Sequence, residues 1–256
     1  RGITGMVYRT IQGTTRLVGG GIDALFANLI PLLRPPQGAS SGAREAVLAA
    51  LNGVLGDHLA ASANPLAIEM RLRRNGMPLT LTREGLATGI PHAGGRILVL
   101  VHGLCMNDLQ WNRKGHDHGE ALESAAGYTP VYLHYNSGCH VSTNGRALAE
   151  LLETLVAAWP APVESLAIIG HSMGGLLARS ACHYGARAGH GWPGHLHRMV
   201  FLGTPHHGAP LERSGNWVNV VLEFSPYTAA LARLAKLRSA GITDLRHGSI
   251  LDDDWE

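Results

Sequence analysis

The sequence has few of the features that mark disordered, membrane-spanning or nucleic-acid-binding chains. Charged residues make up only 16% of the 256 residues, whereas hydrophobic residues make up 45%, a balance typical of a globular protein. No run approaches the roughly 18–20 consecutive apolar residues that a transmembrane helix needs. The formal net charge is +2 with neutral histidine, which is too small to indicate binding to the phosphates of a nucleic acid.

Cysteine is also scarce, with Cys105, Cys139 and Cys182 as its three occurrences. Each lies in or beside a segment expected in the core or the site, which favours reduced thiols over a disulfide framework. One Cys105–Cys139 bridge is the alternative, because both residues follow strands at the same end of the predicted sheet. Cysteine usage therefore favours a cytoplasmic protein, with secretion as the alternative. The sequence begins at Arg1 and shows no signal-peptide pattern, so we expect a processed form or a fragment.

The most informative segment is Gly170-His171-Ser172-Met173-Gly174-Gly175. It follows an apolar run at 166–169 that suits a buried parallel strand, and it precedes helix-forming residues. A serine at such a sharp turn presents its hydroxyl at the carboxyl end of a sheet, and the flanking glycines leave room for the turn. The helix that begins there directs backbone N–H groups toward a developing oxyanion. The segment predicts the nucleophile elbow of a serine hydrolase, with a glycine-rich structural turn as the alternative.

A second motif, His102-Gly103-Leu104-Cys105, follows another apolar run at 96–101. Acyl transfer needs two N–H donors at the tetrahedral oxyanion. Met173, the residue after the serine, is expected to supply one donor, and Leu104 the other. Gly103 lets the backbone approach closely, and His102 is expected to orient the loop by hydrogen bonding without titrating. Taken alone, these residues also suit an ordinary turn at the end of a strand.

With a third segment, the chain resembles the lipase and esterase branch of the α/β-hydrolases. The matching segments are Leu98-Val99-Leu100-Val101-His102-Gly103-Leu104, Gly170-His171-Ser172-Met173-Gly174-Gly175 and Phe201-Leu202-Gly203-Thr204-Pro205-His206-His207-Gly208. In bacterial lipases and related hydrolases, a turn similar to the third segment lies beside the mouth of the active site. The resemblance covers residues 90–210. It implies that Ser172 is the nucleophile and that Met173 and Leu104 form the oxyanion hole, supported by Gly170, His171 and Gly174, with no cofactor or metal.

Strand-like and helix-like segments alternate along the rest of the chain, which predicts an α/β fold with a mainly parallel sheet covered by helices on both faces. A leading β-hairpin is expected, with its strands at 66–72 and 78–82 joined by Asn75-Gly76. The remaining predicted strands are 96–102, 130–135, 166–170 and 198–202, with helices near 117–126, 143–159 and after the elbow.

The chain is predicted to have two parts. Residues 1–62 form a helical extension, with helices over 1–33 and 44–61, and residues 63–256 form an incomplete α/β-hydrolase core. The helix over 1–33 is expected to dock on that core, with weak contact to a membrane surface as the alternative. Residues 209–241 lie where a lid or cap would be inserted.

The acid and the histidine of a catalytic triad have no convincing position in the sequence. In this fold they follow the serine, on loops after the last two strands, but no apolar strand follows 198–202. We expect these strands, with the acid and the base, to lie beyond Glu256. Asp244 and His247 are weak candidates, since a pair three residues apart poorly matches two separate loops.

Two further groups of histidines allow competing interpretations. His206 and His207 are expected to shape the turn near the site rather than to act as the base. The run His116-Asp117-His118 contains residue types that bind metals, but a solvated loop or a helix cap is favoured because no third ligand is evident.

The sequence thus predicts a hydrolase of small-molecule or lipid carboxylic esters that acts through an acyl-enzyme on Ser172. An acyltransferase or amidase on the same scaffold is one alternative. A non-catalytic binding protein is the other, because no convincing base is present. The oligomeric state is left open.

Overall fold

The computed structural model describes residues 42–208 and 239–255. The helix expected over 1–33 and most of the lid or cap expected over 209–241 lie outside these residues. Among the described helices, none is both long enough and apolar enough to cross a membrane.

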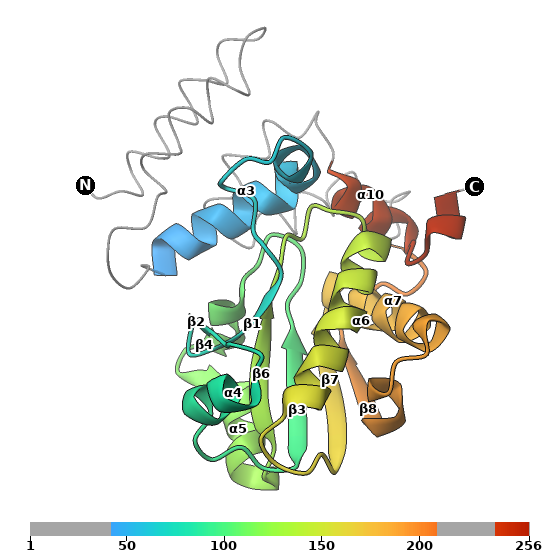
Figure 1. The fold of residues 1–256 in the computed structure, drawn as a ribbon. Coiled ribbons are helices and arrows are strands. Elements are labelled where there is room, and N and C mark those ends of the chain that lie inside the picture. The colour runs from blue at the N-terminus through green and yellow to red at the C-terminus, as the bar shows by residue number, and fades with distance from the viewer. Residues whose placement is uncertain (1–41, 209–238, 256) are drawn as a thin grey trace, which may run out of the picture.

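A six-stranded sheet with the order β2-β1-β6-β3-β7-β8 forms the centre of the molecule (Figure 1). The strands are β1 (Arg71–Arg74), β2 (Met77–Pro78), β3 (Arg96–Val101), β6 (Thr129–His134), β7 (Ser165–His171) and β8 (Leu196–Leu202). The pair β1–β2 is antiparallel, and β1 also pairs antiparallel with β6. Strands β6, β3, β7 and β8 are mutually parallel. The predicted α/β-hydrolase fold, with its leading antiparallel hairpin and mainly parallel sheet, is confirmed.

Alternate side chains of each strand point to opposite faces of the sheet. Because apolar side chains lie on both faces, helices cover both of them. On one face, residues such as Val99 and Ile168 join the main core with α6 (Val141–Ala158) and α7 (Met173–Ala188). On the other face, Leu98 and Leu100 pack with Trp111 and with Leu122 from α5 (His118–Ala126). The other described elements are α4 (Arg83–Gly89), α10 (Ala240–His247), η1 (Asp108–Trp111), η2 (Trp192–His195), η4 (Asp252–Trp255) and a small sheet of β4 (Asn112–Arg113) and β5 (His116–Asp117).

Helix α3 (Gly42–Ala61) lies across the end of the sheet at which the parallel strands finish (Figure 1). Its apolar side chains, including Leu51 and Leu55, belong to the main core. Its backbone also lies against the loops after β3 and β6, because a Cβ on Gly53 would come 2.9 Å from the Cys105 backbone. The helix predicted over 44–61 is confirmed, and it supports the loop that follows β3.

Two predictions about this region were wrong. The strand expected over 66–72 begins only at Arg71, because the Asn52 side chain of α3 bonds to the backbone of this segment, accepting from Ile68 N–H at 2.9 Å and donating to Leu66 O at 2.8 Å. The partner strand, expected over 78–82, ends at Pro78. Thr82 instead caps α4, which was not predicted, by accepting from Gly85 N–H at 3.0 Å.

The alternative of a Cys105–Cys139 bridge is also wrong, since all three cysteines are free. Helix α3 gives each of the two thiols a different neighbour. Cys105 Sγ lies 3.9 Å from Ala50 O, and Cys139 Sγ lies 3.8 Å from Gly56 O.

Candidate active site

Ser172 occupies the sharp turn between β7, which ends at His171, and α7, which begins at Met173. Its backbone has φ 51° and ψ −121°, a conformation that residues other than glycine rarely adopt. Such a backbone is strained by roughly 1–3 kcal/mol and persists only where the surroundings hold it. The Ser172 N–H donates to Leu202 O at 2.8 Å, which ties the turn to β8. Although Ser172 is the N-cap residue of α7, its side chain makes no capping hydrogen bond, so the hydroxyl is not used to cap the helix.

The glycines around Ser172 are needed because backbone atoms pass very close to them. A Cβ on Gly170 would come 2.6 Å from Gly175 Cα, and a Cβ on Gly174 would come 2.2 Å from Val101 O. Cβ atoms do not approach other atoms this closely in real structures. The two glycines therefore allow α7 to pack directly against β7 and the end of β3.

The structure brings the segment after β3 into contact with the elbow. A Cβ on Gly103 would lie 3.1 Å from both Ser172 Cβ and His171 Nδ1. Met173 is the first residue of α7, a position whose N–H has no acceptor within the helix. Leu104, buried and next to Gly103, belongs to the same loop, and the following Cys105 N–H donates to Ser137 Oγ at 3.0 Å. The Gly103 loop, which includes Leu104, thus packs against Ser172, while the roles of Met173 and Leu104 as oxyanion donors stay a prediction.

His102 is fully buried beneath this loop. Its ring stacks on Tyr135 with 4.4 Å between centroids, and the Tyr135 hydroxyl donates to His102 O at 2.9 Å. Burial lowers the pKa of His102 to about 3, so the ring is neutral at ordinary pH. His102 Nδ1 lies 2.9 Å from Gly103 O, which assigns the proton to Nδ1 because a carbonyl oxygen only accepts. These contacts hold the ring in place, and its role in orienting the loop stays a prediction.

Three buried ionisable side chains and the partly buried Arg73 form a closed ring next to the loop, which the sequence analysis missed. Arg73 Nη1 lies 2.9 Å from Glu45 Oε2 and 3.2 Å from Asp108 Oδ1. His134 closes the ring, with Nδ1 at 3.1 Å from Asp108 Oδ1 and Nε2 at 3.9 Å from Glu45 Oε2. Burial alone would raise the pKa of Asp108, but His134 and Arg73 outweigh it and the pKa is lowered. The ring links α3, β1 and β6 to η1, which continues the chain from the loop of Leu104.

The turn after β8 lies beside the elbow, which agrees with the place that the resemblance implies. A Cβ on Gly175 would come 2.1 Å from Thr204 Oγ1, so the turn packs on the first turn of α7. Arg179 Nη1 lies 3.2 Å from His206 Nδ1, and the His206 ring meets Phe201 edge-on at 4.6 Å. Desolvation, followed by the charge of Arg179, lowers the pKa of His206.

Asp244 and His247, the weak acid and base candidates, both lie on α10. The buried Asp244 carboxylate accepts from Val141 N–H at 2.6 Å and lies 3.2 Å from His140 Nδ1. It therefore caps the amino end of α6. These contacts give Asp244 a structural use, while its proposed catalytic role with His247 stays a prediction.

The His116-Asp117-His118 run matches the helix-cap interpretation. Asp117 is buried and caps α5, accepting from Gly119 N–H at 2.7 Å and from the Tyr132 hydroxyl at 2.6 Å. His116 Nε2 and His118 Nδ1 lie 3.2 Å apart on the exposed side. Among the described residues, no group of three or more potential ligands could hold a metal ion.

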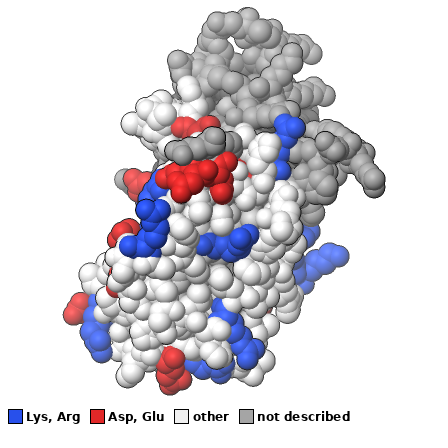
Figure 2. All heavy atoms as spheres, turned by 90° about the vertical axis from the view of Figure 1, so that its right-hand side faces the viewer, with Lys and Arg blue, Asp and Glu red and all other residues white. Residues whose placement is uncertain are grey.

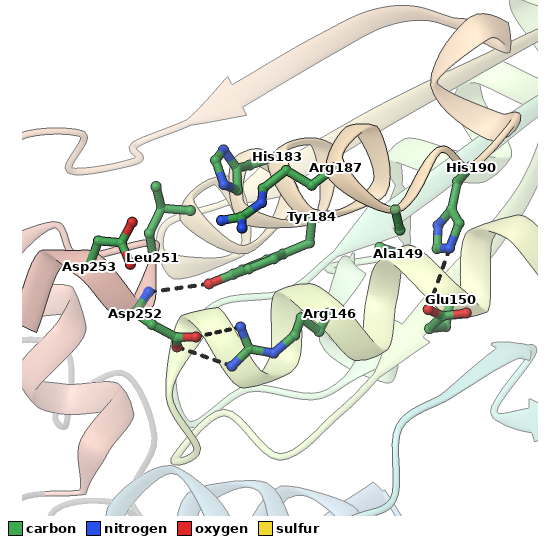
Figure 3. A pocket seen from close by; sticks show the side chains of 11 residues that line it. Arg146, Ala149, Glu150, His183, Tyr184, Arg187, His190, Leu251, Asp252 and Asp253 are labelled. Atoms are coloured by element: carbon green, nitrogen blue, oxygen red, sulfur yellow. Dashed lines mark hydrogen bonds and ion pairs between the residues drawn. The ribbon is translucent and has the colours of Figure 1, made fainter.

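A cavity of about 430 Å³ lies between α6, α7 and η4 (Figure 3). Arg146 crosses it to pair with Asp252, Tyr184 forms part of its wall, and Glu150 pairs with His190. The face of the molecule turned to the viewer in Figure 2 shows carboxylates gathered near Lys and Arg side chains. The α7 residues of the cavity begin at His183, which at 1.5 Å per residue is about 16 Å along the helix from Ser172. This cavity is therefore separate from the candidate active site.

Comparison with known proteins adds a family to this geometry. A family model described as the PGAP1-like alpha/beta domain matches residues 92–256. No curated protein sequence matches the chain.

Solved structures similar to this chain include a lipase of Bacillus licheniformis in two forms. The mature form is 20% identical with a TM-score of 0.44, covering 70% of this chain and 61% of its own. The propeptide form is 22% identical with a TM-score of 0.44, covering 61% and 31%. The N-formylmaleamic acid deformylase of Pseudomonas putida is 14% identical with a TM-score of 0.35, covering 62% and 68%. The chain thus spans about three-fifths of the mature lipase. Because the family model covers well over half of the sequence, the chain belongs to the family of the PGAP1-like alpha/beta domain, an α/β-hydrolase family.

Proposed function

We propose that this protein hydrolyses carboxylic esters with Ser172 as the nucleophile. The observation that carries the proposal is the strained Ser172 backbone at the β7–α7 turn, whose hydroxyl does not cap the helix that it begins. A serine held at a cost of this kind, with the Gly103 loop packed against it, is what presenting a nucleophile requires.

In the proposed reaction, Ser172 Oγ attacks the ester carbonyl carbon and the carbonyl oxygen becomes an oxyanion. The N–H groups of Met173 and Leu104 donate to that oxyanion, which stabilises the tetrahedral intermediate. The serine proton passes to a general base and from there to the departing alkoxide, which leaves an acyl-enzyme. Water then attacks the acyl carbon, and the carboxylate is released with Ser172 regenerated.

Covalent labelling by a fluorophosphonate tests this proposal directly. The wild-type chain is expected to gain one adduct, and Ser172→Ala is expected to gain none. Ser124→Ala is the matched control, because Ser124 is an exposed serine on α5 whose hydroxyl donates to Glu120 O. Wild-type protein that stays unlabelled, or Ser172→Ala that labels as well as the wild type, would contradict the proposal.

The alternatives on the same scaffold have different readouts. An acyltransferase would divide the acyl group of a p-nitrophenyl ester between water and an added alcohol, with the alcohol favoured. An amidase would release p-nitroaniline from the matching anilide. A binding protein would give none of these products while retaining its fold.

A further inference from the structure

The small hairpin of β4 and β5 reaches the candidate active site through Trp111, which directly precedes β4. The Trp111 ring lies edge-on to His171, the residue before Ser172, with 6.4 Å between centroids. The Trp111 ring also lies edge-on to His118, with 5.9 Å between centroids. Trp111 is 8% exposed and packs in the core on the α5 face of the sheet. Because the ring is fixed in this way, the hairpin has a defined position beside the elbow.

The tip of this hairpin carries two permanent positive charges. Arg113 and Lys114 are both exposed, and among the described residues neither forms an ion pair with a carboxylate. Arg113 follows Trp111 by two residues, and burial, followed by the charge of Arg113, lowers the pKa of His171. The nearby Asp117 carboxylate is buried and occupied in capping α5. The exposed carboxylate of this region is Glu120, which lines a cavity of about 230 Å³ on the side of Asn75 and Tyr132.

The turn of the hairpin holds Lys114 in a backbone conformation that lysine adopts only under strain. Lys114 has φ 55° and Gly115 has φ 78°, and the β1–β2 hairpin has the same signs at Asn75 (φ 52°) and Gly76 (φ 74°). Two-residue turns with positive φ at both positions strongly prefer Asn-Gly. The first hairpin follows that preference, whereas the second replaces asparagine by lysine. The turn therefore presents the charge of Lys114 at the tip of the hairpin, at a position where lysine is uncommon.

We propose that Arg113 and Lys114 select substrates that carry an anionic group, a carboxylate or a phosphate, close to the scissile ester. This inference rests on the proposed function of Ser172, because it concerns which esters reach that serine. Two exposed cations attract an anion within the screening length of about 8–10 Å. Each contact of this kind is weak in water, so the pair is expected to favour an anionic over a neutral ester by about three- to tenfold. Two cations are too few for binding to a nucleic acid.

The specificity test compares two p-nitrophenyl esters of similar size, the neutral hexanoate and the anionic half-ester of adipate, whose carboxylate is too far along the chain to cleave its own ester readily. For each enzyme form the measured quantity is the ratio of kcat/KM for the adipate to that for the hexanoate. Lys114→Asn removes the charge and installs the residue that the turn prefers, so a misfolded hairpin is not an explanation for its effect. We expect the ratio to fall about threefold in Lys114→Asn and up to about tenfold in Arg113→Gln/Lys114→Asn at low salt.

Arg198→Gln is the matched control, because Arg198 is an exposed arginine near the amino end of β8, at the opposite end of the sheet. Its ratio is expected to equal that of the wild type. A ratio that stays the same in the double variant, or that falls equally in Arg198→Gln, would overturn the proposal.

A binding measurement separates failure of this inference from failure of the proposed function. Ser172→Ala lacks the nucleophile, so calorimetric titration with the adipate half-ester reports binding without turnover. The expected result is tighter binding of the half-ester than of the hexanoate, lost when Arg113→Gln and Lys114→Asn are added. Equal binding of the two esters would overturn the inference even if Ser172 is labelled. Absence of labelling together with selective binding of the half-ester would instead overturn the proposed function alone.

Discussion

Two serines of this protein each begin a helix, and they are used in opposite ways. Ser239 begins α10 with an ordinary extended backbone, and its hydroxyl accepts from Ile242 N–H at 3.3 Å and donates to Gly53 O at 2.7 Å. Ser172 begins α7 with a strained backbone and makes no capping bond. The first serine stabilises the fold, whereas the second is held at a cost in stability with its hydroxyl left for another use.

The same contrast extends to the surroundings of the two serines. Around Ser172, glycines remove side chains so that the backbones of β3, β7 and α7 come together. Near Ser239, the buried Asp244 side chain of α10 has a structural partner, since it caps α6. The polar side chains of Ser239 and Asp244 have structural partners, whereas the Ser172 side chain makes no capping bond.

Disruption of the elbow backbone should give the largest loss of stability. In Gly174→Ala the new Cβ would meet Val101 O at 2.2 Å, a backbone atom that has no room to move. We expect a loss of about 3 kcal/mol in the free energy of unfolding, measured by urea denaturation. Gly194→Ala is the control, because a Cβ there meets nothing within 4 Å. Equal free energies of unfolding for the two variants would contradict the tight packing of backbone around Gly174.

Removal of the α6 cap should destabilise the fold without abolishing the chemistry. In Asp244→Ala the Val141 N–H loses its acceptor, so we expect a loss of about 1–2 kcal/mol in the free energy of unfolding. The rate of fluorophosphonate labelling at Ser172, measured below the unfolding transition, is expected to stay near that of the wild type. If the stability stayed constant while the labelling rate collapsed, Asp244 would be a member of the triad instead.

Substitution of each helix-starting serine by glycine sharpens the comparison further. Ser172→Gly relieves the positive φ, so we expect the free energy of unfolding to rise by up to about 1 kcal/mol while labelling is lost. Ser239→Gly removes two buried hydrogen bonds, so we expect a fall of about 1 kcal/mol. Thermal unfolding of the two variants side by side checks the opposite signs. A fall in both would show that Ser172 is not strained.

The smallest effect is expected at the carboxyl-terminal segment, where Arg146 pairs with Asp252 (Figure 3). The hydrogen bond from Arg146 lowers the pKa of Asp252 to about 2. Because the folded-state pKa lies below the unfolded one, this contribution to stability is present above about pH 4 and is lost as the pH falls through 2. Asp252 is 55% exposed, so screening limits the contribution to less than about 0.5 kcal/mol. Wild type and Asp252→Asn should therefore differ slightly at pH 6 and converge at pH 2, as measured by urea denaturation.

The parts of the fold that follow from local pattern could be predicted from the sequence. Apolar runs indicate the strands over 96–101 and 165–171. Glycines indicate the elbow, because a side chain at those positions would clash with nearby backbone. The hairpin of β4 and β5 was missed because its turn uses Lys114 in place of the asparagine that marks such turns. The strand expected over 66–72 was too long because Asn52, far away in the sequence, bonds to its backbone.

The ring of Glu45, Arg73, Asp108 and His134 shows a limit of a different kind. Its members come from four separate segments, and each alone has the sequence appearance of an ordinary surface charge. The pairing of β1 with β6 brings Arg73 and His134 together, and the packing of η1 and α3 against these strands adds Asp108 and Glu45. Pairing that depends on tertiary contacts leaves no signal in the local sequence.

Intact-mass measurement of the protein after reaction with a fluorophosphonate tests the central claim most directly. The account predicts a single adduct on the wild type, located at Ser172 by peptide mapping, and no adduct on Ser172→Ala or Ser172→Gly. Wild-type protein of unchanged mass, or an adduct that persists in Ser172→Ala, would contradict the assignment of Ser172 as the nucleophile.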